Sequence, residues 1–114
     1  MQYMLILSED PELMATPEQR ELAFQRVGEY AMGLIGDGVL TGGSPLHPVT
    51  EARKIRVRDG KPRILEGPFA ESKEVIAGYF LIEAPDLDAA VSIAAKCPNA
   101  EFGSVEVREI VPMG

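Results

Sequence analysis

The sequence has few of the residues on which the commonest catalytic and structural sites depend. Its 114 residues include one cysteine, one histidine and no tryptophan. A single cysteine, Cys97, cannot form a disulfide within the chain, so we expect a reducing compartment, the cytoplasm. The histidine, His47, lies far from Cys97 in the sequence, and no acidic spacing matches a calcium-binding loop. We therefore predict that the protein binds no metal.

Basic residues and long apolar runs are also scarce. The chain has 11 Lys and Arg residues against 18 Asp and Glu, which gives a formal net charge of −7. This balance argues against nucleic acid and against an anionic membrane surface as partners. No apolar run approaches the roughly 20 residues that span a bilayer. The apolar start, residues 1–7, lacks a basic region, so we expect no signal peptide.

A glycine-rich loop that would bind phosphate is missing too. Residues 36–38 read Gly-Asp-Gly, but they follow a predicted helix instead of preceding one, which is the wrong context for dinucleotide binding. We therefore expect no cofactor.

The patterns that are present predict one α+β domain over residues 1–114. Their order is strand, helix, strand, hairpin, strand, helix, strand. This order predicts a ferredoxin-like fold, in which two helices pack on one face of an antiparallel sheet. The expected strands cover residues 3–7, 39–43, 52–58 with 63–65, 75–84 and 104–111, and the helices follow Thr16 and Asp86.

Local signals support these boundaries. Thr16, Pro17 and Gln19 have the spacing of a capping box with proline at the first helical position. The glycines after residue 35 end that helix, and Pro98 is expected to stop the second one. Asp59-Gly60 predicts a tight turn between two strands. The basic side chains of that hairpin favour a solvent-facing position at the edge of the sheet.

The central strands are apolar on both faces. Residues 3–7 and 76–82 do not alternate, although an antiparallel sheet with one wet face should. A second apolar face of this size is unfavourable in water, and a twin sheet from a second copy would cover it. We therefore predict a homodimer. The alternative is that these are central strands with a few tolerated apolar residues.

One stretch carries a resemblance to a known family. Residues 66–74, EGPFAESKE, followed by GYFLI at 78–82, resemble the signature of the YCII-related, or DGPF-domain, family. The segments at 3–6, 42–43, 46–48, 86–90 and 103–108 fit the same pattern. Glu66 stands where the signature usually has aspartate, which keeps the negative charge on a longer side chain.

The resemblance implies a dimeric α/β barrel and says little about activity. Some YCII relatives carry a proposed catalytic His–Asp pair with the histidine on the first helix. This chain has no histidine there, so the pair is not transferred to it. Other relatives are associated with sigma factors of the extracytoplasmic-function type, which implies a regulatory context.

Five side chains are candidates for ligand binding. Glu71 and Lys73 lie at the mouth of the central strand, although a solvated loop with weak ion pairs explains them as well. His47 has a side chain suited to acid–base work near neutrality, or it is a surface residue. The hydroxyls of Tyr30 and Tyr79 either face a cleft or find partners at the edge of the core. No catalytic residue is assigned.

We expect a small polar metabolite to bind between the first helix and the sheet. Three alternatives remain: a regulatory module linked to a sigma factor, a cofactor-free isomerase or oxygenase-like enzyme, and a scaffold without a pocket.

Overall fold

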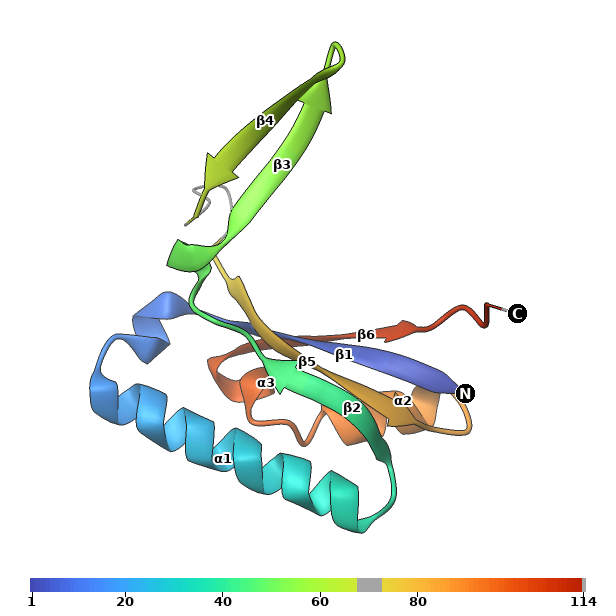
Figure 1. Cartoon of the computed structure of the whole chain (residues 1–114). Coiled ribbons are helices and arrows are strands. Elements are labelled where there is room, and N and C mark those ends of the chain that lie inside the picture. The colour runs from blue at the N-terminus through green and yellow to red at the C-terminus, as the bar shows by residue number, and fades with distance from the viewer. Residues whose placement is uncertain (68–72, 114) are drawn as a thin grey trace.

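The computed structural model describes residues 1–67 and 73–113 and shows a main antiparallel sheet with helices on one face (Figure 1). The main sheet has four strands in the order β2-β5-β1-β6. Both helical connections, β1-α1-β2 and β5-α2-β6, join strands that are not neighbours in that sheet. This is the predicted ferredoxin-like fold, and the prediction is confirmed. The strands are β1 (Gln2–Glu9), β2 (Leu40–Pro45), β5 (Val75–Glu83) and β6 (Gly103–Glu109).

The first helix, α1 (Pro17–Gly36), begins and ends as its caps predict. The Thr16 hydroxyl accepts a hydrogen bond from the Gln19 amide at 3.1 Å, and the Gln19 side chain accepts one from the Thr16 amide at 2.9 Å. Two amides that lack partners within the helix are thereby satisfied. Gly38 has φ of 71°, a conformation that glycine adopts at no steric cost and that ends the helix. A short turn, η1 (Pro11–Met14), precedes this helix.

The second helix is shorter than expected. Asp86 caps α2 (Leu87–Ala94) by accepting a hydrogen bond from the Ala89 amide at 2.8 Å, as predicted. The helix ends at Ala94, and an additional short helix, α3 (Asn99–Phe102), follows Pro98. Proline lacks an amide hydrogen and fits best at a helix start, so Pro98 begins a new turn as well as stopping the old one.

The hairpin is not part of the main sheet, so its predicted place at the sheet edge is wrong. Strands β3 (Arg53–Arg58) and β4 (Lys61–Glu66) form a two-stranded sheet of their own. Asp59 and Gly60 have φ of 54° and 73°, as a tight primed turn requires. Figure 1 shows the hairpin rising away from the helices, beyond the turn η2 (Val49–Glu51).

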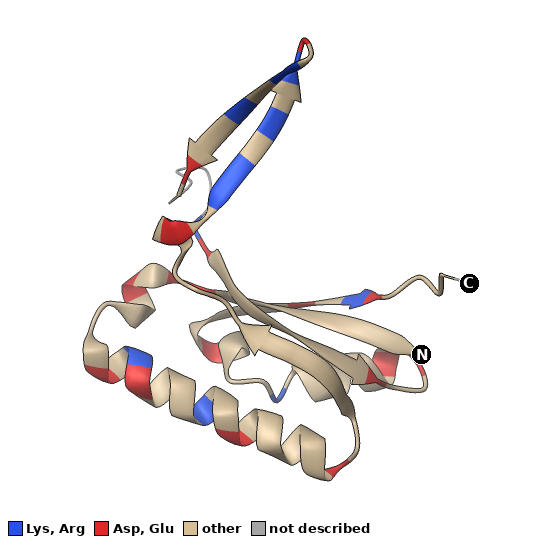
Figure 2. Ribbon diagram, viewed as in Figure 1, with Lys and Arg blue, Asp and Glu red and all other residues tan. Residues whose placement is uncertain are grey.

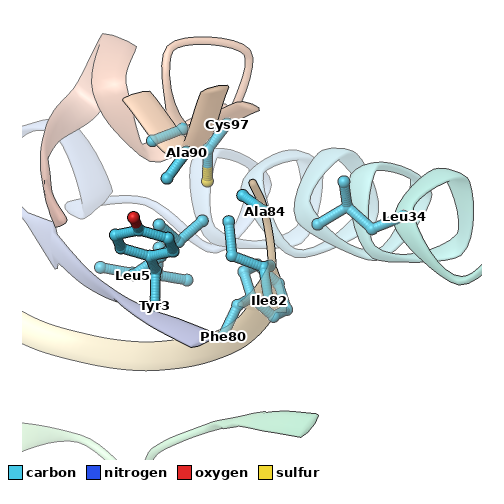
Figure 3. Close-up of a cluster of buried hydrophobic side chains, with 10 residues drawn as sticks. Tyr3, Leu5, Leu34, Phe80, Ile82, Ala84, Ala90 and Cys97 are labelled. Carbon is cyan, nitrogen blue, oxygen red and sulfur yellow. The ribbon is translucent and has the colours of Figure 1, made fainter. Parts of the chain in front are cut away.

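The core lies between the main sheet and the helices (Figure 3). Tyr3 and Leu5 of β1 pair across the sheet with Ile82 and Phe80 of β5, and all four are buried. Leu34 of α1 belongs to the same buried cluster. Ala90, Ala94 and Cys97 cover it from the segment around α2. No helix in the part of the chain that the structure describes is long and apolar enough to cross a membrane.

The other face of the sheet carries apolar residues, and no helix of the described residues covers it. Met4 pairs with Leu81, and Ile6 pairs with Tyr79, across the two central strands. These four side chains are half-buried. Figure 1 shows all three helices on the opposite side of the sheet. We call this surface the open face.

Two neighbouring glycines in β2 offer a matched test of the sheet. Gly43 has φ of 145°, and an added Cβ would lie 2.6 Å from the Tyr79 carbonyl oxygen. An added Cβ at Gly42 would meet only the flexible end of Leu81, at 3.3 Å. We expect Gly43→Ala to lower the free energy of unfolding by about 2 kcal/mol and Gly42→Ala by less than about 1 kcal/mol. Urea denaturation measures both, and equal losses would contradict the strain assigned to Gly43.

Candidate functional site

A cleft of about 450 Å³ opens between α1 and the sheet. Its walls come from residues 20–31 of α1, the end of β1, the beginning of β5, the β2–η2 connection and α3. This is the place at which the sequence predicted a cleft.

Small residues make room for the cleft. Ala23, Gly28 and Ala31 line it from α1, where larger side chains would fill the space against the sheet. Opposite them, Gly78 of β5 lies close to the backbone of β2, since an added Cβ would be 2.9 Å from the Ser44 carbonyl oxygen. The remaining wall is largely apolar and includes Phe24, Val27, Leu46, Ile76, Phe80 and Phe102.

Glu9 brings a carboxylate into this apolar cleft. Side chains alternate along β1, so Glu9 follows Tyr3, Leu5 and Leu7 on the helix-facing side of the sheet. Its cross-strand neighbour on β6 is Gly103, which has no side chain to cover it. Within residues 1–67 and 73–113, the carboxylate has no hydrogen-bond or ion-pair partner. Burial raises the pKa of the Glu9 carboxyl, because the apolar surroundings disfavour the charged form.

Two further polar side chains line the cleft. Asn99 is only 2% exposed, and its Oδ1 accepts a hydrogen bond from the Cys97 thiol at 3.7 Å. Arg20 donates from Nη1 to the carbonyl oxygens of Met14 and Ala15, at 3.1 and 3.3 Å. These bonds hold the start of α1 against the preceding turn. The cleft thus combines an apolar wall with a few fixed polar groups, which is the usual composition of a small-molecule site.

Two of the five predicted residues line the cleft. Tyr79 borders the cleft from β5, although its half-buried side chain alternates with Phe80 onto the open face, and His47 contributes from the β2–η2 connection. The His47 side chain is 90% exposed, and its Nδ1 lies 3.7 Å from Oε2 of Glu51, four residues later. His47 therefore sits at the rim with an exposed carboxylate beside it.

The other predicted residues lie elsewhere. The Tyr30 hydroxyl donates to the Ile93 carbonyl oxygen at 2.7 Å, and its ring packs on Phe80 with centroids 5.9 Å apart. Burial raises the pKa of Tyr30, and its position is that of a link between α1 and α2. The Lys73 ammonium is 4.0 Å from the Asp10 carboxylate. Glu71 lies outside the described residues, as does Phe69 of the signature. The ligand-binding roles of all five stay predictions.

No metal-binding cluster is found among the residues that the structure places. In the described ranges, no three His, Cys, Asp or Glu side chains gather closely enough to hold an ion.

Comparison with known proteins identifies the family. A model of the YCII-related domain matches residues 1–114. The chain belongs to the YCII-related domain family. The resemblance read from the signature segment is thereby confirmed, although the model of the family does not name a reaction.

Two individual proteins are similar to this chain. An uncharacterized protein of Rhizobium meliloti (strain 1021) is 40% identical over 67 residues, which is 57% of this chain and 54% of that protein. The match therefore spans about half the length of that relative. The solved structure of 5-chloro-2-hydroxyhydroquinone dehydrochlorinase from Burkholderia phenoliruptrix, in complex with 2,5-dihydroxybenzoquinone, superposes with a TM-score of 0.54 at 12% identity. It covers 97% of this chain and 94% of the enzyme, and it shows a shared fold.

Sequence reasoning missed Glu9 and Asn99. A signal for Glu9 was present, because the alternation that buries Tyr3, Leu5 and Leu7 places Glu9 next on the same face. Asn99 had no comparable signal, since it depends on the short helix α3, which the residues after Pro98 did not predict.

The raised pKa of Glu9 predicts a specific pH dependence. The folded state holds this proton more tightly than the unfolded state, so its contribution stabilises the fold at low pH and is lost as pH rises through the folded pKa. Glu9→Gln removes the titrating group. We therefore expect the stability of the variant relative to wild type to increase between pH 4 and pH 7. Urea denaturation across this range measures it, and a relative stability that stays level or falls would contradict the burial of the carboxyl.

Proposed function

We propose that the protein binds a small ring-shaped ligand with few polar substituents in the cleft between α1 and the sheet. The observation that carries this proposal is the Glu9 carboxyl, which lines a largely apolar cleft and has no partner among the described residues. A partly buried group of this kind, with a perturbed pKa and in a concave site, is typical of ligand binding or catalysis.

The size and lining of the cleft narrow the ligand class. A volume of about 450 Å³ lies within the range of pockets that enclose small molecules. Phe24, Phe80 and Phe102 supply aromatic surface, which favours a flat ring over a strongly polar metabolite. The sequence favoured a polar metabolite, whereas the lining favours a ring with polar groups at its edge.

Glu9 would orient such a ring. A carboxyl with a raised pKa is protonated over a wider pH range than usual, so it can donate a hydrogen bond as well as accept one. It therefore suits a ligand hydroxyl or ketone oxygen. The amide of Asn99 is a second fixed polar group in the lining.

The dehydrochlorinase of shared fold was solved with 2,5-dihydroxybenzoquinone, which is a ring of this class. That complex describes the other protein. It supplies a rational first probe for this one, alongside simple phenols.

A glycine in the cleft provides the test of ligand binding. Added Cβ atoms at Gly28 and Gly33 of α1 meet nothing within 4 Å, but only Gly28 lines the cleft. We expect Gly28→Leu to weaken binding of 2,5-dihydroxybenzoquinone or a phenol at least roughly tenfold, because leucine occupies the ligand's space. The control, Gly33→Leu, should bind as wild type does.

Changes in amide chemical shifts during NMR titrations measure the affinity of each variant for the ligand and show where the ligand binds. Leucine has a higher helix propensity than glycine, so we do not expect either variant to lose binding by unfolding. Equal binding by the two variants, or shifts away from the cleft in wild type, would overturn the proposal.

We also propose that two copies pair through the open face. Met4, Ile6, Tyr79 and Leu81 form an apolar strip along the two central strands on the side without helices. Sheets that pack face to face bury such strips at a spacing of about 10 Å. A second copy presents the same strip, so a two-fold axis satisfies both surfaces at once.

The open face also offers a matched pair of variants. Ile6→Lys places a charge in the middle of the strip and should yield a monomer in sedimentation velocity at concentrations where wild type is dimeric. Ile35→Lys alters an apolar residue of α1 that is 54% exposed, and should leave the dimer intact. A monomeric wild type, or dissociation by both variants alike, would contradict pairing through this face.

A further inference from the structure

The hairpin β3–β4 differs in charge from the rest of the chain (Figure 2). Residues 53–66 contain six of the 11 basic residues and two of the 18 acidic ones, which gives the hairpin a formal charge of +4. The rest of the chain therefore carries a formal charge of −11, since the whole chain has −7. We call residues 53–66 the arm and the remainder the body.

The two faces of the arm have different chemistry. Residues opposite one another on paired strands share a face. On one face Ile55 pairs with Ile64 and Val57 pairs with Pro62. The other face carries the cross-strand pairs Lys54–Leu65, Arg56–Arg63 and Arg58–Lys61. The first face also carries the pair Arg53–Glu66 at the base of the arm and is apolar from there to the tip, whereas the other face is basic.

The apolar face has no cover in the isolated chain. Ile55, Val57 and Ile64 are 65%, 59% and 66% exposed. A two-stranded hairpin alone is marginally stable in water and needs packing on one face. The radius of gyration is 15.7 Å, against about 13 Å for a compact domain of this length, so the arm projects from the body.

We infer that the arm docks on a second copy of this chain and grips the body of that copy. The inference rests on the homodimer proposed above and adds to it a contact outside the paired sheets. The apolar face of the arm would pack on the partner, while the long basic side chains of the other face would extend around its edges and tip and attract the partner's acidic body.

The direction and length of the arm fit this role. Figure 1 shows the arm rising on the side of the sheet that lacks helices, which is the side where the open face would receive the partner. Each strand has six residues, or about 20 Å at roughly 3.3 Å per residue. Packed sheets lie about 10 Å apart, so the arm reaches past the partner's sheet.

The charge distribution favours a second copy of the chain over nucleic acid as the partner of the arm. A basic ribbon can bind phosphate, but here it is attached to a body of charge −11 that repels a polyanion. The same body is the complementary surface for the arm of another copy. Nucleic-acid binding is therefore kept as an outcome of the test.

Adjacent residues of β4 give matched variants, because Ile64 is on the apolar face and Leu65 on the basic face. We expect Ile64→Thr to raise the dimer dissociation constant roughly tenfold, and Leu65→Thr to change it little, in sedimentation at matched salt. Threonine keeps strand propensity in both. Added salt should weaken the wild-type dimer, because it screens the attraction between the basic arm and the acidic body.

Cross-linking separates the arm from the dimer itself. Copies labelled with ¹⁵N are mixed with unlabelled copies and treated with a carbodiimide, which joins lysine amines to carboxylates. Lys61, at the tip, should form mixed-isotope cross-links to acidic residues of the body. A dimer without such cross-links, and with equal effects of Ile64→Thr and Leu65→Thr, would overturn the arm contact and leave the sheet dimer standing. A monomeric wild type would overturn both. An arm that binds DNA oligonucleotides in place of a second copy would overturn the arm contact alone.

Discussion

The antiparallel pairing of β1 with β5 is the constraint on which the rest of the structure depends. These strands occupy the centre of the sheet, and their register decides which side chains share a face. One face receives Tyr3, Leu5, Phe80 and Ile82, which form the core under the helices. The other receives the open-face strip. A slip of one residue would exchange the two faces, so core, cleft and open face are fixed together.

Predictions from the sequence succeeded where the determining interactions are local. Thr16 and Gln19 cap α1 through bonds three residues apart, and Asp59-Gly60 forms its turn by backbone preference alone. The placement of the hairpin failed, because nothing local distinguishes an edge hairpin from one that leaves the sheet. At the cleft, Tyr79 and His47 were named from the sequence and Glu9 was not, and the ligand-binding roles of the named residues stay predictions.

The cleft and the proposed interfaces share one segment of the chain. The β2–η2 connection, with Leu46 and His47, lines the cleft, and the arm begins just beyond it. Leu46 is also held to the central strand, since its amide donates to the Ala77 carbonyl oxygen at 2.8 Å. A partner bound to the arm would therefore constrain the position of one wall of the cleft. Oligomeric state and ligand affinity would then be coupled through a short stretch of backbone.

The two points where the arm leaves the body lie side by side, because the Gly67 amide donates to the Ala52 carbonyl oxygen at 3.0 Å. A segment whose ends already meet can be lengthened at a small cost in loop-closure entropy, because that cost grows only slowly with length. The main sheet supplies none of the pairing of β3 and β4. The arm thus behaves as a closed insert, whose sequence can drift or be exchanged while the ferredoxin-like core keeps its register. Selection can therefore tune self-recognition independently of folding.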